Sequence, residues 1–230
     1  MFTVTERWKN AHANAMVAVL VVREATNVRE HPELEKRKRT LEADLATRFC
    51  GPDDIKAAAP ILAYTAYYKR FEKTYHLVQQ LKTVALKRRP LPTVSGLVDV
   101  MFMAEMEHLL LTAGHDLAAV VPPVRLDAGT GVEEYVKMNE QSQVAKAGDM
   151  MVIDSRGILS SIIHGPDLRS RLTLETRDAM YVVYGPAGIT RDDVARHLGA
   201  IRASIQVFSP SALFEPARIL SGRGVEEMDV

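Results

Sequence analysis

His115 and Asp116 are the adjacent side chains best suited to proton chemistry, and they follow Gly114 at the end of an apolar segment. Imidazole changes its protonation near neutral pH, so a histidine held in a cleft can position a water molecule. We expect a loop at this point to present both side chains to such a cleft. In the alternative interpretation Asp116 caps the next turn and His115 only packs.

Ser160, Ser161 and His164 supply further polar side chains inside an apolar, strand-like segment. Because successive residues of a strand face opposite ways, Ser160 shares a face with His164, whereas Ser161 does not. No Gly-x-Ser-x-Gly motif accompanies them, so we do not expect a hydrolytic triad.

Glu105 and His108 form a Glu-x-x-His pair, which on a helix aims both side chains the same way. A di-iron carboxylate site needs a second such pair, and the sequence has none. The seven histidines form no zinc array, and no glycine-rich loop could cradle phosphates. We therefore expect neither a metal nor another cofactor, and we expect Glu105 and His108 to form a polar edge of an apolar helix.

Residues 69–89 carry the local charge that a polyanion would require, although the chain as a whole has a formal net charge of 0. This stretch has seven basic residues and one acidic residue, Glu72. Four aromatic residues between positions 67 and 75 are interleaved with the cations, a combination that suits unpaired RNA bases. In the alternative interpretation the aromatic rings belong to the core and the cations only solvate a pair of helices.

Residues 90–140 reverse the sign, with eight acidic residues against Arg125 and Lys137. A negative face of this kind could pair with the positive stretch of a second copy. Self-association into a homo-oligomer therefore stays open beside RNA binding.

Composition places the chain among ordinary globular proteins, with 230 residues, of which 47% are hydrophobic and 25% are charged. The single cysteine, Cys50, excludes an internal disulfide and a thiolate zinc cluster. The longest apolar run, residues 15–22, is shorter than the ~20 residues of a membrane span, and no signal-peptide pattern precedes it. We expect a soluble, cytoplasmic protein without a membrane partner.

The first half of the chain is predicted to be mostly helical. Residues 16–22 are continuously apolar and β-branched, which predicts one strand buried on both faces. Helices are predicted over 32–49, two or three times within 53–87, and over 95–111. The basic run 36–39 lies inside the first of these helices, where we expect a solvated face rather than a binding site.

The second half is predicted to be rich in strands. Extended segments are expected at 124–126, 149–154, 158–163 and 179–184, with a hairpin turn at 155–157. Thr190 is a good N-cap for a last helix, and the residues after Pro216 are expected to form a loosely held tail. The pattern predicts one α+β domain over residues 1–215, with mixed or antiparallel sheet, and a tail over 216–230.

Residues 62–184 resemble the B3/B4 domain of the phenylalanyl-tRNA synthetase β subunit. The resemblance is carried by Val98-Asp99-Val100 within the stretch 91–100, by Gly114 to Leu117, and by the segments 149–154, 157–165 and 173–183. It implies a free-standing α+β module of this type, because no synthetase flanks it. Such domains hydrolyse tyrosine misattached to phenylalanine tRNA, bind the tRNA 3′ end in a pocket, and use an ordered water with help from the terminal ribose hydroxyl.

Family positions that line the editing pocket carry different residues in this chain. An Asn after the Val-Asp-Val motif and a later His match Phe102 and Ala113 here. The glutamate that reads the tyrosine hydroxyl falls near Gly165-Pro166, with Asp167 close by. The resemblance therefore implies a pocket whose tyrosine specificity does not carry over.

Two functions follow from these residues. The first is an aminoacyl-tRNA deacylase acting in trans, with catalytic His115 and Asp116 and with tRNA as its partner. Its substrate pocket and RNA contacts are assigned to Ser160, His164 and Thr173 and to Lys82, Lys87, Arg88, Arg89, Arg169 and Arg171. The second is a non-catalytic protein on the same fold that binds RNA or an amino-acid-like small molecule. Neither function involves DNA.

Overall fold

Strand β2 (Met16–Arg23) lies at the centre of the larger sheet, as its β-branched sequence predicts. The computed structural model describes residues 2–230. In it β2 pairs with β10 (Ala179–Gly185) and with β12 (Ala217–Ser221), and all side chains from Val17 to Val22 are buried. A strand covered on both faces needs apolar residues at every position, which explains the unbroken run.

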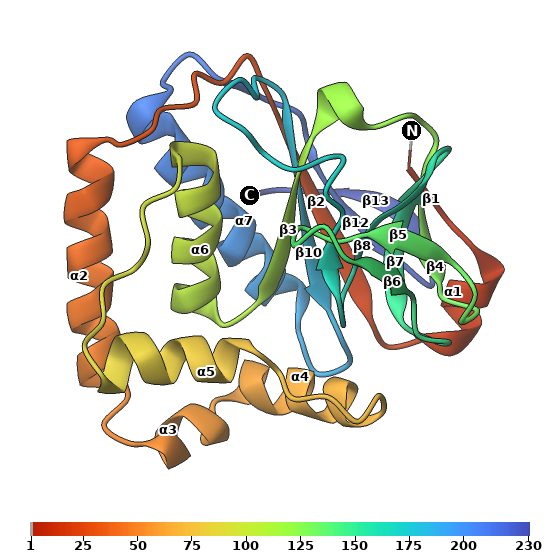
Figure 1. The fold of residues 1–230 in the computed structure, drawn as a ribbon, viewed down its shortest axis with the longest axis horizontal. Helices are drawn as coiled ribbons and strands as arrows, with labels where there is room; N and C mark the ends of the chain where they lie inside the picture. Colours follow the sequence, from red (N-terminus) through yellow and green to blue (C-terminus); the bar gives the residue numbers. More distant parts are fainter. Residues whose placement is uncertain (1) are drawn as a thin grey trace.

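The strands of residues 2–230 form a six-stranded sheet, called the larger sheet, a five-stranded sheet, called the smaller sheet, and the separate hairpin β5–β6 (Figure 1). The larger sheet has the order β13-β12-β2-β10-β3, with β11 paired to β2, and the smaller has the order β1-β4-β7-β8-β9. β1 runs parallel to β4, and the other described pairs are antiparallel. The remaining strands are β1 (Phe2–Val4), β3 (Leu111–Asp116), β4 (Val124–Ala128), β5 (Glu134–Val136), β6 (Ser142–Val144), β7 (Met150–Asp154), β8 (Gly157–Ser161), β9 (Gly165–Pro166), β11 (Leu213–Phe214) and β13 (Gly224–Met228).

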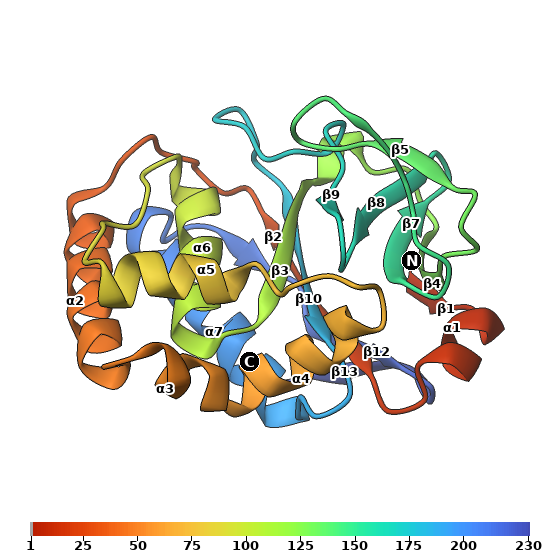
Figure 2. The same cartoon turned by 60° about the horizontal axis from the view of Figure 1, so that its bottom comes forward.

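Helices α2, α3, α5 and α6 are gathered on the side of the larger sheet that faces away from the smaller sheet, as Figures 1 and 2 show. α4 reaches the smaller sheet, where Tyr67 bonds Asp149 and the Met150 amide. α7 packs on β2 and β10 and also against α6. The helices are α1 (Glu6–Ala11), α2 (Pro32–Arg48), α3 (Pro52–Ala57), α4 (Ala59–Lys69), α5 (Leu77–Leu81), the π-helix η1 (Lys82–Leu86), α6 (Gly96–His108), the 3₁₀-helix η2 (Leu117–Ala119) and α7 (Arg191–Phe208). This α+β architecture, with helices concentrated in the first half, confirms the predicted fold class.

Local signals in the sequence also form as predicted. Thr190 and Asp193 make a capping box at the start of α7, in which the Thr190 side chain accepts from the Asp193 amide. The β7–β8 hairpin closes through Gly157, whose φ of +131° suits glycine. α6 ends at His108, because Leu109 adopts a left-handed φ of +64°.

Three predictions differ from the structure. His115 and Asp116 end strand β3 instead of lying in a loop, since β3 pairs with β10 over its whole length. The residues after Pro216 form β12 and β13 of the larger sheet instead of a loose tail, because Ile219 and Leu220 bury their side chains beside β2. In the basic run of α2, Lys38 is buried rather than solvated.

Candidate functional site

A cavity of about 350 Å³ lies between α5, α6, β3 and the segment 161–172. α6 contributes Val98, Met101, Phe102 and Glu105, whose spacing of three and four residues places them on one face of the helix. The other lining residues are His76, Gln80, Leu111, Thr112, Ala113, Gly114, Met138, Ser161, Gly165, Pro166, Arg171, Leu172 and Tyr184. The walls are thus mainly apolar, with a few polar groups, as is usual for a site that binds a small ligand.

Glu105 is the acidic group among the described residues that line this cavity. It is only 3% exposed, and its Oε1 accepts a hydrogen bond of 2.7 Å from the backbone N–H of Thr112. Burial disfavours the charged carboxylate and raises the pKa of Glu105 to about 8, although the Thr112 N–H acts in the opposite direction. In the sequence, Glu105 stands out as an acidic residue inside a mostly apolar helical segment. The sequence predicts that it forms a polar edge of the helix and does not predict that it lines a pocket.

A row of polar groups continues behind Glu105 toward α7. The hydroxyl Oγ1 of Thr112 lies 2.6 Å from Nε2 of His197, and the His197 ring packs edge-on to His108. Burial lowers the pKa of His197 to about 3, and the neighbouring His108 adds to the effect. His197 is therefore a neutral imidazole at pH 7, and it does not balance the charge of an ionised Glu105.

Gly114 keeps the cavity open on the β3 side. A Cβ added at this position would lie 2.7 Å from Cδ1 of Leu172 and 3.4 Å from Sδ of Met101. Both neighbours line the cavity, so a larger residue at 114 would push the Leu172 side chain from its place.

His115 lies behind the cavity wall and is fully buried. Its Nδ1 is 2.7 Å from the hydroxyl of Ser170 and its Nε2 is 3.1 Å from the hydroxyl of Ser160. Ser170 in turn donates to Asp167, and Ser160 Oγ lies 2.8 Å from the hydroxyl of Tyr184, which lines the cavity. Burial, and then Arg169, lower the pKa of His115 to about 3, so its imidazole is neutral at pH 7. His115 thus holds Ser160 and reaches the cavity only through Tyr184.

The other residues predicted for catalysis or for the pocket also lie outside the cavity lining. Asp116 accepts from the Ala118 amide and from the Thr176 hydroxyl, which caps the turn after β3. Thr173 donates its N–H to Thr176, and the backbone N–H of His164 donates to Ser161. These contacts position the loops that carry the three residues, and none of the three lines the cavity.

Four of the predicted positions, though not Asp116, have a sequence neighbour that does line the cavity. Gly114, Ser161, Gly165 and Leu172 stand one residue away from His115, Ser160, His164 and Thr173, respectively. In β8 this offset reflects the alternation of side chains between the two faces of a strand. In β3 residues 111–114 line the cavity in succession, and His115 lies beyond them, buried against Ser160 and Ser170. β8 ends at Ser161, so the predicted shared face of Ser160 and His164 does not extend to residue 164.

The arginines predicted to contact RNA have different environments. Arg169 bonds both carboxylate oxygens of Asp154, at 3.0 and 3.1 Å, and also contacts Asp167 and the carbonyl of Ala119. These internal partners occupy its guanidinium group, so it is not free to meet a phosphate. Arg171 is exposed and lies at the cavity, and within residues 2–230 its guanidinium group bonds the Leu168 carbonyl and no other group.

Most basic residues of the stretch 69–89 are exposed, whereas three of the four aromatic residues between positions 67 and 75 are buried. Lys87, Arg88 and Arg89 lie on the surface directly after η1, and Lys82 is half-buried at its start. Tyr67, Tyr68 and Tyr75 are buried, and their hydroxyls bond Asp149, the Ile162 carbonyl and the Leu109 carbonyl, respectively. These three rings therefore belong to the core and are not available to stack on bases, whereas Phe71, the fourth aromatic residue, is only partly buried.

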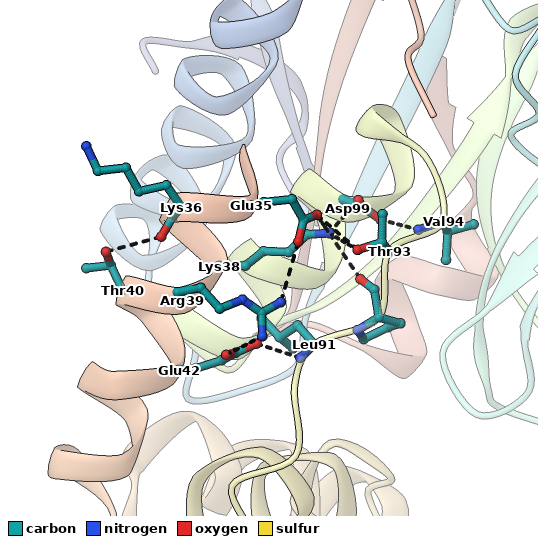
Figure 3. Close-up of polar contacts among 11 residues, drawn as sticks. Glu35, Lys36, Lys38, Arg39, Thr40, Glu42, Leu91, Thr93, Val94 and Asp99 are labelled. Carbon is teal, nitrogen blue, oxygen red and sulfur yellow. Dashed lines mark hydrogen bonds and ion pairs between the residues drawn. The ribbon is translucent and has the colours of Figure 1, made fainter. Parts of the chain in front are cut away.

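A buried network fixes the start of α6, as Figure 3 shows. The ammonium group of Lys38 bonds Asp99 Oδ2 at 2.7 Å, Glu35 Oε1 at 2.5 Å, the Thr93 hydroxyl at 3.0 Å and the Pro92 carbonyl at 3.2 Å. Asp99, the acid of the Val-Asp-Val motif, also accepts from the Val94 amide. The motif thus orients the helix that carries Phe102 and Glu105 to the cavity.

Phe102, Ala113, Gly165 and Pro166 all line this cavity. They are the positions matched above to the family's editing pocket, and they come from three separate parts of the chain. Within residues 2–230, no three His, Cys, Asp or Glu side chains converge as a metal site would require. No helix in the same range has the length and hydropathy to cross a membrane.

The fold is similar to that of a solved N-terminal fragment of the phenylalanyl-tRNA synthetase β subunit from Pyrococcus horikoshii. The TM-score is 0.54 and the sequence identity is 12%; the match covers 100% of this chain and 54% of that one. The chain thus spans about half of the fragment and shares a phenylalanyl-tRNA synthetase β-like fold. No protein-family model matches the chain. A search of curated proteins also gives no match.

Proposed function

We propose that this chain binds the aminoacylated 3′ end of a tRNA in the cavity between α5, α6 and β3 and releases the amino acid by hydrolysis, acting in trans as a B3/B4-like protein. The observation that carries the proposal is the convergence of Phe102, Ala113, Gly165 and Pro166 on one cavity. At about 350 Å³ the cavity lies in the range of small-ligand sites, which suits an aminoacyl group.

Exposed cations support the approach of the tRNA strand. Gln80 on α5 lines the cavity, and Lys82, Lys87, Arg88 and Arg89 follow it along the chain. Arg171 stands at the cavity itself. Arg171 would meet the phosphates of the tRNA terminus, and the basic residues after α5 would meet phosphates further along the strand, while the net charge of 0 keeps nonspecific attraction weak.

In the proposed reaction a water molecule attacks the ester carbonyl. The water oxygen bonds to the acyl carbon and the bond between this carbon and the ribose oxygen breaks. One proton of the water passes to the ribose oxygen, the other is released to solvent, and the amino acid leaves as a carboxylate. As the family resemblance implies, the terminal ribose hydroxyl assists this water. His115 is assigned an indirect role, because it holds Ser160 and thereby the Tyr184 hydroxyl, and Asp116 is assigned to the loop that follows.

A second candidate is a non-catalytic protein that binds an aminoacyl or amino-acid-like ligand in the same cavity. One observation favours it: the wall positions occupied by Asn and His in the family are apolar here, as Phe102 and Ala113, and His115 is shielded from the cavity. Binding would then use the same walls without positioning a water.

Single-turnover deacylation of a panel of mischarged tRNAs tests the two candidates. Release faster than spontaneous hydrolysis for at least one aminoacyl-tRNA supports the first. Saturable binding of an aminoacyl-tRNA without accelerated release supports the second. Absence of both release and binding across the panel would exclude both functions.

A further inference from the structure

We infer that Glu105 anchors the primary ammonium group of the ligand in this cavity, whether the ligand is an aminoacyl ester or a free amino acid. The inference rests on the proposed function, since it concerns the same cavity. It names the chemical group that the cavity recognises and the residue that recognises it.

The position of Glu105 gives the first argument. Glu105 comes from the cavity face of α6 and lies among apolar walls formed by Met101, Phe102 and Leu111. Its Oε1 accepts the Thr112 N–H, and among residues 2–230 no hydrogen bond to its Oε2 is formed. One carboxylate oxygen therefore fixes the side chain, while the other is left for a donor in the cavity.

The surroundings of Glu105 give the second argument, because they supply no cation beside it. The titratable and charged groups that line the cavity with it or interact electrostatically with it are Tyr64 and Tyr68 on α4, Tyr75 and His76 before α5, Tyr184 on β10 and Arg171; His197 and His108 lie behind Thr112. Asp99 and Glu107 on α6, His115 and Asp116 on β3, and the charged residues of α7 lie outside the cavity lining. The tyrosines are neutral hydroxyls, and burial lowers the pKa of His76, His108 and His197. Arg171 is exposed to solvent.

A buried carboxylate without a counter-charge takes up a proton, and burial accordingly raises the pKa of Glu105 to about 8. A ligand ammonium group would provide the missing charge and a strong hydrogen bond in a site of low polarity. The opposite charge, Arg171, lies on the exposed side of the cavity. Together the two residues match a ligand with an ammonium group inside and an ester, carboxylate or phosphate oxygen outside.

Paired probes test the inference on the unmodified protein. The probes are adenosines that carry an L-alanyl, L-leucyl or L-phenylalanyl group through a stable 3′-amide, each with a free amine and as its N-acetyl twin. Free L-alanine, L-leucine and L-phenylalanine form a third arm that distinguishes an amino-acid ligand from an aminoacyl-nucleoside. Affinities are measured by titration calorimetry at pH 7.

We expect at least one free-amine probe, or the matching free amino acid, to bind at least ~10-fold more tightly than the N-acetyl adenosine probe with the same side chain. A factor of this size corresponds to the free energy of one hydrogen bond to a charged group. Proton release from Glu105 on binding should appear as a dependence of the measured enthalpy on the buffer. Equal affinity of the amine and N-acetyl forms would overturn the role of Glu105 and leave the cavity as the ligand site. If no probe of any form binds, the inference fails together with the assignment of the cavity.

The variant Glu105→Gln gives a second test, because a glutamine oxygen can still accept the Thr112 N–H. The preference for the free amine should fall to about 1-fold, and the buffer dependence should disappear. Glu107→Gln is the matched control, because Glu107 is exposed on the same helix. It should retain both properties. A preference that persists in a folded Glu105→Gln protein would overturn the inference.

Discussion

Lys38 and Asp99 form an ion pair between α2 and α6, with 2.7 Å between Nζ and Oδ2 and with exposed fractions of 1% and 2%. Figure 3 shows that the same ammonium group also reaches the segment before α6. The pair therefore joins α2 to the start of the helix that carries Phe102 and Glu105.

Removing one partner of this pair should strongly destabilise the protein. In Lys38→Met the carboxylate of Asp99 stays buried without its cation, which costs about 3–5 kcal/mol. Urea denaturation measures the loss. Lys36→Met is the control, since Lys36 is exposed on the same helix and should change stability by less than about 0.5 kcal/mol. A loss below 1 kcal/mol in Lys38→Met would contradict the importance of the buried pair.

Glu105→Gln should alter how stability depends on pH. The folded protein holds the Glu105 proton up to pH about 8, whereas the unfolded chain releases it near pH 4.3, so the folded state binds more protons in between. The wild-type free energy of unfolding therefore falls as pH rises through this window, by at most about 1.4 kcal/mol per pH unit from this group. Glutamine does not titrate, so the free energy of unfolding of the variant should rise relative to that of the wild type between pH 5 and pH 8, as measured by urea titrations. Glu107→Gln should show the same dependence of stability on pH as the wild type. If the curve of Glu105→Gln also runs parallel to that of the wild type, the pKa of Glu105 is not raised.

His115→Ala should show the opposite dependence on pH. At pH 7 the variant leaves a void and removes partners of two buried hydroxyls, for a loss of about 2–4 kcal/mol. The pKa of His115 is about 3 in the folded protein and about 6.5 in the unfolded chain. The contribution of His115 to the free energy of unfolding of the wild type is therefore lost as the pH falls from about 6.5 to about 3. The gap to the variant should therefore narrow on acidification. In Leu198→Ala, which is equally buried and removes no titrating group, the gap should stay constant.

Gly114→Ala should reduce ligand binding with little loss of fold. The added methyl group would displace the flexible end of Leu172, a lining residue, and so change the cavity wall. We expect the affinity for an aminoacyl-adenosine probe to fall by about 10-fold, because a change of one methylene group in an apolar pocket has an effect of at least this size. In Gly51→Ala the new methyl group meets no atom within 4 Å, and this control should bind normally. Unchanged affinity in Gly114→Ala would place the ligand elsewhere.

Replacement of Lys87, Arg88 and Arg89 by alanine should weaken tRNA binding and reduce its salt dependence. Each lost phosphate contact makes the negative slope of log affinity against log salt less steep by about 0.7 to 0.9, so the loss of three contacts changes the slope by about 2 to 3. Titrations at several salt concentrations give both quantities. A triple alanine variant of Arg191, Arg196 and Arg223, also exposed, is the control for general charge. If both variants behave alike, this stretch is not the RNA site.

The sequence determined the approximate bounds of the longer elements, among them α2, α6, β2, β7 and β10. The β-branched run of β2, the capping residues of α7 and the turn glycine of the β7–β8 hairpin are local signals, and each formed as predicted. Such signals depend on backbone geometry within a few residues, so they need no knowledge of the rest of the chain. The strands after Pro216 were missed because their register is set by β2, some 200 residues away.

Only the tertiary structure decided which side chains line the cavity. The sequence pointed to the segments around positions 114, 161, 165 and 172, yet the residues chosen there stand one position from those at the wall. In β8 a shift of one residue exchanges the two faces of the strand, so Ser161 and not Ser160 meets the cavity. In β3 residues 111–114 all line it, and the packing of His115 against Ser160 and Ser170 keeps that ring behind the wall. Burial acts in the same way on Lys38 and Glu105, because a polar residue on a helix becomes a buried ion pair or a protonated acid only through the neighbours that exclude water from it.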